Sequence, residues 1–447
     1  MLKGVQTGLL WISLEDISQE LLQKLQLAYT YEHPFEQSKS FETYVIHSGK
    51  IGLPYGNTDK LKQLLPPRHI THRTIAPTVT TPFEFKWELR DYQQDTHNQI
   101  IDYLSRGGTE FNLSGSCGSG KSVYLAALLA HLGVKTLVLA HMSMLTAQLH
   151  KEISESTTAD VRLLSAKSRE LGDVNIATSQ FISQNPDIWY EIKHNIGCIV
   201  IDEAETLASK TTLRIVQRAH ARYHIYISAT FSRETDNRTD ALTDFAGKAR
   251  FVLDNSKVNI PVTVVMTKCS EMFPRFISKN TYVKAKQKFF KESSILDKIK
   301  TLSELSLAKG RQVLVAADII ELQNSVAEAL QVHGVGILNS KTSKKSRIQI
   351  LGDYDKGTIR VLIAAAVVNA GLSIPKISTI VRVSFPNSET KSVQLVGRAQ
   401  RPLEGKVRAF VFDLVFRGQN PTKRVKAYKD NGFNVRVTNY EELIEGL

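Results

Sequence analysis

Short apolar runs alternate with longer amphipathic stretches along most of this chain. From about residue 109 onward, each run has the character of a buried strand, and the stretch that follows it has helical periodicity. The first set of strands is expected over Thr136 to Ala140, Val161 to Leu164, Val174 to Ala177, Cys198 to Ile201 and His224 to Ile227. The alternation predicts βα units that form a parallel sheet with helices on both faces.

The alternation stops after Leu253 and resumes later. Residues 255–292 are rich in Lys and aromatic residues, and we interpret them as a basic connector. The second set of strands is expected over Gln312 to Ala316, Arg360 to Ala364, Thr379 to Val383 and Arg408 to Phe412. The chain is therefore predicted to hold two α/β domains, residues 86–254 and residues 293–447.

The first 85 residues fit neither sheet. Prolines that favour extended or turning chain mark the end of this segment, at Pro66, Pro67, Pro77 and Pro82. Its apolar residues suffice for a small core, among them Leu9, Leu10, Trp11, Leu21 and Leu22. We interpret residues 1–85 as a separate N-terminal accessory domain.

Composition excludes several classes of protein. With 42% hydrophobic and 23% charged residues, the chain is neither disordered nor collagen-like. Its three cysteines lack C-x-x-C spacing, which favours a reduced, cytoplasmic compartment. The longest apolar run, Val361 to Val368, is far shorter than the ~20 residues that cross a bilayer. Glu15 and Asp16 interrupt the first apolar stretch, so we expect neither a signal peptide nor a membrane partner.

The chain carries an excess of positive charge. Its 57 Lys and Arg residues outnumber 44 Asp and Glu residues, which leaves a formal net charge of +13. A basic balance favours a polyanionic partner such as nucleic acid, although it also serves solubility alone.

A phosphate-binding motif follows the first apolar run of the first α/β domain. The eight residues from Gly115 to Ser122 fit G-x-x-x-x-G-K-S/T, and a helical run comes next. Glycines let backbone N–H groups approach phosphates, while the Lys supplies a cation and the Ser an oxygen for Mg²⁺. The motif predicts ATP and Mg²⁺ as cofactors, bound by Gly115, Gly118, Ser119, Gly120, Lys121 and Ser122.

Two acids follow the apolar run Cys198 to Ile201. We expect Asp202 in the magnesium shell and Glu203 as the base that accepts the proton of the attacking water. Taken alone, an Asp-Glu pair after a strand is more often a helix start with the Asp as N-cap. The upstream P-loop favours the catalytic interpretation.

Four further blocks, in order along the chain, resemble motifs of the superfamily 2 helicases. They are Leu89 to Gln93 (the Q-motif region), Thr178 to Gln180 (block Ib), Ser228 to Thr230 (block III) and Gln394 to Arg401 (motif VI). The resemblance covers about seventy per cent of the chain. It implies two RecA-like parallel-sheet domains in tandem that share one ATP, with Gln93 reading the adenine.

The resemblance also assigns roles in the second domain. It implies that Arg398 and Arg401 stabilise the charge developing on the γ-phosphate, with Gln394 in the nucleotide site. In isolation, such arginines more often lie on a solvated helix face. Because a motor must tolerate every sequence, its DNA contacts should reach phosphates, and the candidates are Thr178, Ser179, Lys341, Lys344 and Lys345. A solvated helix start remains the alternative for the three lysines.

Several positions differ from the family pattern. Glu205 stands where many relatives have His or Asp, Ser373 where Asp is usual, Ala365 where Thr is common, and Gln400 where Gly is common. The core chemistry survives these differences, but the family's step size and coupling cannot be carried over to this chain.

The stretch from Tyr282 to Val315 resembles the phage branch-migration helicases, which include the T4 recombination helicase and its T5-like relatives. That resemblance implies a monomer that unwinds or branch-migrates forked and four-way DNA, in recombination and repair, in the host cytoplasm. Basic residues of the N-terminal domain, namely Lys60, Lys62, Arg68 and Arg73, are candidates for duplex contacts, although a domain that only packs fits equally.

Two other functions fit the same motifs. One is an RNA helicase, and the other is an ATP-gated DNA-binding protein that does not move. Only a motor displaces strands or moves branches and stops with a non-hydrolysable nucleotide. No separate nuclease is predicted, because no second metal-carboxylate cluster stands out.

Overall fold

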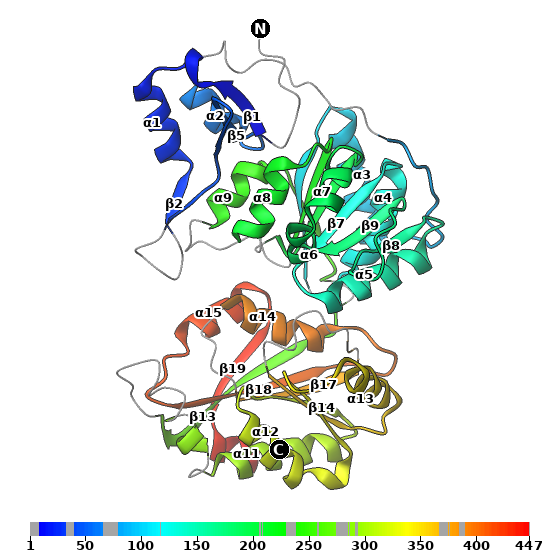
Figure 1. Ribbon diagram of the computed structural model, residues 1–447. Coiled ribbons are helices and arrows are strands. Elements are labelled where there is room, and N and C mark those ends of the chain that lie inside the picture. The colour runs from blue at the N-terminus through cyan, green and yellow to red at the C-terminus, as the bar shows by residue number, and fades with distance from the viewer. Residues whose placement is uncertain are drawn as a thin grey trace. The chain divides into compact units, whose positions relative to one another are not determined.

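The alternating pattern folds as two separate parallel sheets (Figure 1). The computed structural model describes residues 9–32, 40–65, 79–116, 118–204, 207, 209–228, 238–256, 259–273, 285, 287–290, 294–365, 374, 376–383 and 389–446. The chain divides into two units, Met1–Asn255 and Ser256–Leu447, and each holds one seven-stranded sheet. The predicted class, two α/β domains in tandem plus an N-terminal region, is confirmed.

The sheet of the first unit has the strand order β12-β6-β11-β10-β7-β9-β8, and neighbouring strands are parallel. Because all these strands run the same way, their carboxyl ends share one edge, where ligands bind in open α/β sheets. The strands are β6 (Glu110–Gly115), β7 (Thr136–Ala140), β8 (Val161–Leu163), β9 (Val174–Thr178), β10 (Cys198–Asp202), β11 (Tyr223–Ser228) and β12 (Arg250–Leu253).

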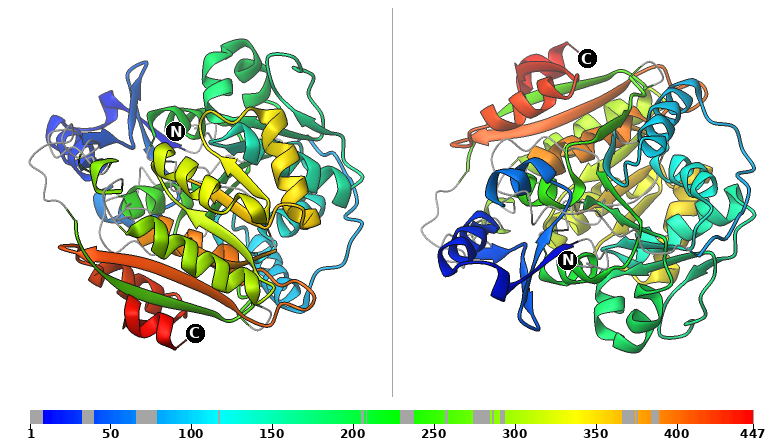
Figure 2. Two further views of the ribbon diagram at one scale, coloured as in Figure 1. Left: turned by 90° about the horizontal axis from the view of Figure 1, so that it is seen from below. Right: turned by 90° about the horizontal axis from the view of Figure 1, so that it is seen from above.

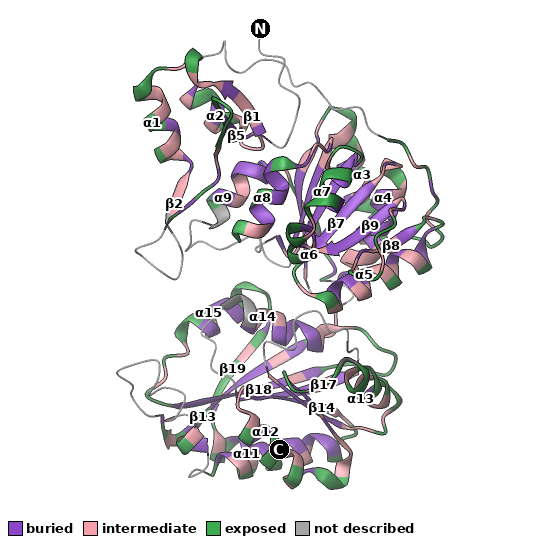
Figure 3. Cartoon of the chain, in the orientation of Figure 1, coloured by how far each residue is buried: buried purple, intermediate pink, exposed green. Residues whose placement is uncertain are grey.

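Alternate residues of the central strands face opposite helical layers. In β10, Cys198 and Val200 belong to one hydrophobic cluster, whereas Ile199 and Ile201 belong to the other. Burial on both faces explains why these strands are continuous apolar runs (Figure 3). The first cluster includes residues of α3 (Asp91–Ser105), α4 (Lys121–Leu132) and α5 (Ser143–Ser156), and the second includes residues of α6 (Ser179–Gln184), α7 (Pro186–Lys193), α8 (Lys210–Arg218) and α9 (Arg238–Ala246).

The sheet of the second unit has the order β15-β16-β14-β17-β18-β13-β19, again with parallel neighbours. Its strands are β13 (Val262–Met272), β14 (Gln312–Ala316), β15 (Val335–Leu338), β16 (Val361–Ala364), β17 (Ile377–Arg382), β18 (Ala409–Arg417) and β19 (Asn434–Asn439). The helices are α11 (Ile295–Ala308), α12 (Ile320–Ala329), α13 (Lys344–Lys356), α14 (Glu389–Gly397), α15 (Thr422–Asp430) and α16 (Tyr440–Glu445).

Part of the segment predicted as a connector is a strand of this second sheet. β13 pairs with both β18 and β19, and Figure 2 shows β13 (green) and β18 (orange) side by side. The exposed Lys268 breaks the apolar run of β13, and both partner strands come far later in the chain, so the local pattern concealed the pairing.

The aromatic residues of the same segment pack inward. The rings of Phe289 and Phe290 contact that of Phe416, with centroids 5.2 and 6.4 Å apart. These two rings therefore pack within the protein and do not stack on nucleic-acid bases. The neighbouring Tyr282 and most of the connector lysines, at positions 279, 284, 286 and 291, lie outside the described residues.

The N-terminal region forms a small domain with its own core. An antiparallel sheet of order β1-β5-β4 packs with α1 (Gln19–Ala28) and α2 (Thr58–Leu64) around Ile12, Leu25, Tyr29, Ile51, Leu53, Leu61 and Leu65. The strands are β1 (Leu9–Ser13), β4 (Val45–His47) and β5 (Lys50–Pro54), and a second pair is β2 (Thr30–Glu32) with β3 (Ser40–Glu42). One 3-10 turn, Leu14–Asp16, lies in this domain, and two more, Gln331–His333 and Arg398–Gln400, lie in the second unit.

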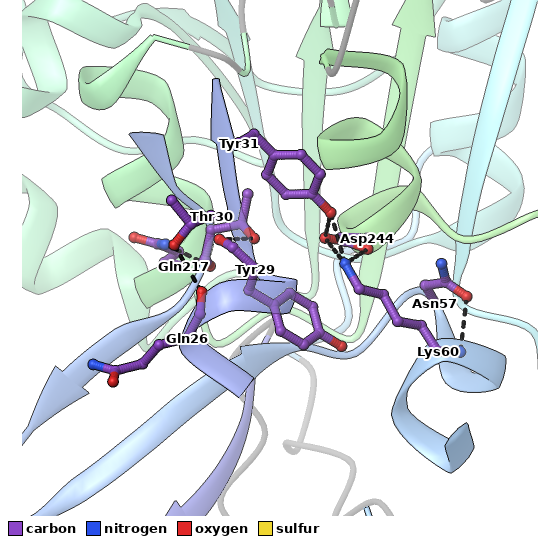
Figure 4. A network of polar contacts seen from close by, with 9 residues as sticks. Gln26, Tyr29, Thr30, Tyr31, Asn57, Lys60, Gln217 and Asp244 are labelled. Atoms are coloured by element: carbon purple, nitrogen blue, oxygen red, sulfur yellow. Dashed lines mark hydrogen bonds and ion pairs between the residues drawn. The ribbon is translucent and has the colours of Figure 1, made fainter. Parts of the chain in front are cut away.

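This domain docks on α8 and α9 of the first sheet's domain through a buried polar network (Figure 4). The Asp244 carboxylate accepts hydrogen bonds from the Tyr31 hydroxyl and from Lys60 Nζ, which lies 2.9 Å from Oδ2 and 3.1 Å from Oδ1. Lys60 Nζ also lies 3.9 Å from the centre of the Tyr29 ring. Burial raises the pKa of Asp244, and the charge of Lys60 opposes that rise.

Backbone contacts and apolar packing complete this interface. Gln217 Nε2 donates to the Thr43 carbonyl at 2.9 Å. A Cβ at Gly56 would lie 2.1 Å from the Phe245 carbonyl oxygen, so only glycine allows this approach. Leu9 and Trp11 pack in the second hydrophobic cluster of the sheet domain. The N-terminal domain is therefore a fixed part of the first unit.

The predicted strands agree closely with those observed. Thr136 to Ala140 and Gln312 to Ala316 match β7 and β14 at both ends, and the other predicted strands differ by a few residues. The sequence analysis missed β12, β13, β15 and β19. β12, β15 and β19 are edge strands, and β12 and β19 mix exposed with buried residues, so none of the three is a long continuous apolar run.

Candidate active site and nucleic-acid interface

The predicted phosphate loop lies between β6 and α4 at the carboxyl edge of the first sheet. Gly118 and Gly120 have φ values of 86° and 71°, which favour glycine. A Cβ at Gly115 would lie 2.4 Å from Ser119 Oγ, so the loop closes tightly on itself. The first N–H groups of a helix have no partner within the helix, so the start of α4 behind this loop offers donors to a phosphate.

The polar side chains of the loop fit a bound nucleotide. Lys121 Nζ donates to the carbonyl oxygens of Gly115 and Ser116, at 2.5 and 3.2 Å, and so lies inside the loop where phosphate oxygens would bind. Ser119 Oγ is buried without a hydrogen-bond partner among the described residues. Ser122 follows in the first turn of α4 and is partly exposed. Cys117 lies outside the described residues.

Gln93 lies against this loop. Its amide Nε2 donates to the carbonyl oxygens of Ser119 and Gly120, at 3.1 and 3.4 Å, and its Oε1 accepts from the Arg90 N–H at 3.1 Å. Gln93 is 3% exposed. It therefore connects the start of α3 to the phosphate loop, a contact that the sequence analysis missed. Its predicted contact with adenine stays a prediction.

The two predicted acids lie at the same sheet edge. Asp202 ends β10, and Glu203 follows it directly. β10 and β6 flank β11, so both sides of β11 carry predicted catalytic groups. Carboxylate and hydroxyl oxygens are the ligands that Mg²⁺ takes from proteins, and Asp202 and Ser122 supply one of each. Within the described ranges, no three His, Cys, Asp or Glu side chains gather as a metal site.

Glu203 has two features that the sequence did not reveal. Its backbone φ is +54°, in the left-handed region. Its Oε2 lies 2.7 Å from Nδ1 of His141, the residue that follows β7. The sequence does show that His141 and Glu203 each follow a predicted strand, and residues that follow neighbouring parallel strands meet at one edge of the sheet. It does not show that β7 and β10 are neighbours, so this contact could not be predicted.

The predicted DNA contacts of the first unit are occupied within the protein. Thr178 caps α6, and its Oγ1 accepts from the Phe181 N–H at 3.1 Å. Ser179 is 6% exposed, and its Oγ accepts from Thr212 Oγ1 at 3.0 Å. The roles of both residues in DNA binding stay predictions.

The lysine cluster of the second unit surrounds the start of α13. Lys341 and Lys345 are exposed, and the Ser343 side chain caps the helix by accepting from the Ser346 N–H at 3.1 Å. Cations are unfavourable at the positive end of a helix, so a bound anion would stabilise this arrangement. The side chain of Lys344 lies outside the described residues.

Motif VI spans α14 and the 3-10 turn Arg398–Gln400. Arg398 is 5% exposed, so it does not belong to a solvated helix face, whereas Gln394 and Arg401 are partly exposed. Lys406 Nζ donates to the Arg401 carbonyl at 3.0 Å. Burial, with the nearby charge of Arg401, lowers the pKa of Lys406 to about 8. Glu205, Thr230 and Ser373 lie outside the described residues.

Two family models match the chain, one in each unit. Residues 86–233 match the family described as type III restriction enzyme, res subunit, and residues 297–402 match the helicase conserved C-terminal domain. In the part of the chain that the structure describes, no helix has both the length and the apolarity to cross a membrane.

Two curated relatives extend over most of the chain. The probable helicase D10 of Escherichia phage T5 is 25% identical over 84% of this chain and 82% of the relative. A DNA 3'-5' helicase XPB of Mycobacterium tuberculosis is 22% identical over 80% of this chain and 67% of the relative.

Solved structures share the fold. S. cerevisiae Dbp5 bound to RNA and ADP BeF3 has a TM-score of 0.57 at 15% identity, over 80% of this chain and 96% of that one. A fragment of a putative HsdR subunit from Vibrio vulnificus has a TM-score of 0.59 at 17% identity, over 80% of this chain and 70% of that one.

The two sheets and the phosphate loop define a P-loop ATP hydrolase with two RecA-like domains. Within that class, the chain belongs to the superfamily 2 helicases.

Proposed function

We propose that this helicase uses ATP and Mg²⁺ to unwind or branch-migrate forked and four-way DNA, as a monomer, in recombination and repair in a host-cell cytoplasm. The observation that supports the ATP-driven step most strongly is the common sheet edge that carries the phosphate loop, Asp202 and Glu203.

The chemistry assigned to the site is phosphoryl transfer to water. Lys121 and the loop N–H groups hold the phosphates, and bound Mg²⁺, held by Ser122 and Asp202, would neutralise their charge. Glu203 takes the proton of the water whose oxygen bonds to the γ-phosphorus as the bond to the bridging oxygen breaks. Arg398 and Arg401 stabilise the charge that develops in this step.

DNA rather than RNA is the proposed substrate. Relatives named DNA 3'-5' helicase XPB, 22% identical over 81% and 80% of this chain, support DNA as the substrate and 3'-5' movement. A putative ATP-dependent RNA helicase of Acanthamoeba polyphaga mimivirus, 23% identical over 92% of this chain and 80% of the relative, supports the RNA alternative instead. Lys341 and Lys345 are exposed, and they are the proposed contacts to phosphates irrespective of base sequence.

The N-terminal domain is the proposed grip on a duplex arm. Lys60 is unsuited to this role because Asp244 holds its ammonium group. The exposed lysines of the described part of the domain, Lys24, Lys50 and Lys62, are the better candidates, and Arg68 and Arg73 lie outside the described residues. Because Leu9 and Trp11 pack in the sheet domain, point changes test this role more cleanly than deletion.

The decisive experiment compares ATPase stimulation by single-stranded DNA, forked DNA, four-way DNA and RNA, together with strand displacement on the branched substrates. We expect DNA to stimulate more than RNA, and displacement to stop with a non-hydrolysable nucleotide. Stronger stimulation by RNA would indicate an RNA helicase. Stimulated ATPase without displacement or branch movement would indicate an ATP-gated binding protein.

A triple charge reversal, Lys24→Glu, Lys50→Glu and Lys62→Glu, tests the duplex grip. Branched-DNA activity should fall while ATPase stimulated by single-stranded DNA stays near wild type. Equal loss on both substrates would contradict the duplex role.

Sedimentation with and without forked DNA tests whether the protein is a monomer.

A further inference from the structure

The strand register brings two residues together that are far apart in sequence. β7 and β10 are parallel neighbours, with Leu139 opposite Ile201. His141 follows β7 and Glu203 follows β10, so both leave the sheet at its carboxyl edge. His141 Nδ1 and Glu203 Oε2 lie 2.7 Å apart, which is the length of a hydrogen bond to an ionised acceptor.

The hydrogen bond constrains one carboxylate oxygen of Glu203 and leaves the other available. An ionised carboxylate has about four acceptor sites on two oxygens, so Nδ1–H uses only part of this capacity. Oε1 can therefore still accept a proton from water. A base that must take a proton from one defined water gains from having its other oxygen fixed, since misplacement of a reacting group by about 1 Å can lower the rate 10²-fold.

Stability does not explain this arrangement. Glu203 is one of two non-glycine residues with positive φ among the described residues, and left-handed backbone is unfavourable for residues with a Cβ. The side chains of His141 and Glu203 are 35% and 24% exposed, and ion pairs this exposed stabilise proteins little. The left-handed backbone of Glu203 thus costs more free energy than the His141–Glu203 pair contributes to stability. Such strain is concentrated at functional sites.

We propose that His141 is a positioning residue for the general base Glu203: its Nδ1–H holds Oε2 so that Oε1 accepts the proton of the attacking water. This inference rests on the proposed function, in which Glu203 is the base. His141 itself touches neither the nucleotide nor the water. The proton passes to Glu203 as the water oxygen bonds to the γ-phosphorus and the bond to the bridging oxygen breaks.

Two substitutions at His141 test the proposal. In His141→Ala the donor is lost, so kcat for DNA-stimulated ATP hydrolysis should fall about 10-fold to 10²-fold, the range seen when orienting partners are removed. KM and the affinity for a fluorescent ATP analogue should change less than about 2-fold, because the hydrogen bond acts on the base and not on the bound nucleotide. His141→Asn places an amide donor where Nδ1 stood, so it should restore most of kcat.

His150→Ala is the matched control. His150 lies on α5 of the same domain, and its Nε2 contacts the Val161 backbone oxygen at 3.2 Å, away from the sheet's carboxyl edge. This variant should keep wild-type kcat. The proposal is overturned if His141→Ala keeps the wild-type kcat. It is also overturned if His141→Ala and His141→Asn lose kcat equally and both have a lowered melting temperature.

Glu203→Gln separates this inference from the function on which it rests. If Glu203→Gln turns over ATP normally, Glu203 is not the base, and the proposed function fails at that point. If Glu203→Gln is inactive but His141→Ala is normal, only the positioning role fails. In single-turnover assays, adding His141→Ala to Glu203→Gln should lower the residual rate no further, because His141 acts through Glu203. A further loss overturns the proposal.

Discussion

Lys60→Met should loosen the N-terminal domain from the first unit. Methionine keeps most of the apolar stem of lysine but leaves the Asp244 carboxylate, 1% exposed, with Tyr31 and without its cation. Removing one partner of a buried ion pair costs about 3–5 kcal/mol. Because 21% of the Lys60 side chain is exposed, we expect the lower end of that range, about 3 kcal/mol.

The pH dependence of this loss follows from Asp244. Burial raises the pKa of the Asp244 carboxyl group above its value in the unfolded chain, so the folded state binds the carboxyl proton more tightly. The contribution of Asp244 to stability therefore falls as pH rises through the raised pKa. Lys60 lowers that pKa, so Lys60→Met should raise it further. The destabilisation should therefore be large at neutral pH and shrink as acid protonates Asp244.

Urea unfolding, followed by tryptophan fluorescence, measures this effect, because Trp11 packs at the docking interface. Lys62→Met is the matched control, since Lys62 is exposed on the same helix and should change the unfolding free energy by less than about 0.5 kcal/mol. Equal effects of the two substitutions, or a Lys60→Met effect that does not vary with pH, would refute the reasoning.

Three further predictions concern the site and the interface. Lys121→Ala should abolish ATP hydrolysis with an unchanged circular dichroism spectrum, because the Lys121 ammonium group donates to carbonyl oxygens of the phosphate loop itself; near wild-type hydrolysis would show that the loop is not the ATP site. Arg401→Ala should lower kcat by roughly 10³, with a modest change in nucleotide affinity, because an arginine finger acts in the transition state; lost affinity at unchanged kcat would make it a binding residue. Gly56→Ala should detach the N-terminal domain and speed its proteolysis, because a Cβ would lie 2.1 Å from the Phe245 carbonyl oxygen; unchanged proteolysis would mean that the interface adjusts.

The sequence by itself determined the elements whose physics is local. The run Thr136 to Ala140 is apolar throughout because both its faces are buried, so its bounds could be predicted without knowledge of its neighbours. The phosphate loop is equally local, since its glycines, Lys121 and Ser122 are contiguous in the chain. The order of the blocks along the chain then predicted two RecA-like domains.

Only the tertiary structure decided the roles that depend on long-range contacts. Lys60 appeared free to bind DNA, but Asp244, 184 residues away in sequence, holds its ammonium group. Ser179 is a predicted DNA contact, and only the structure shows that its hydroxyl accepts a hydrogen bond from Thr212, 33 residues away in sequence. β13 appeared to be connector because its partners, β18 and β19, come at the end of the chain. His141 carried no signal until strand order placed β7 beside β10, since periodicity reports which face of an element is buried and not which element lies next to it.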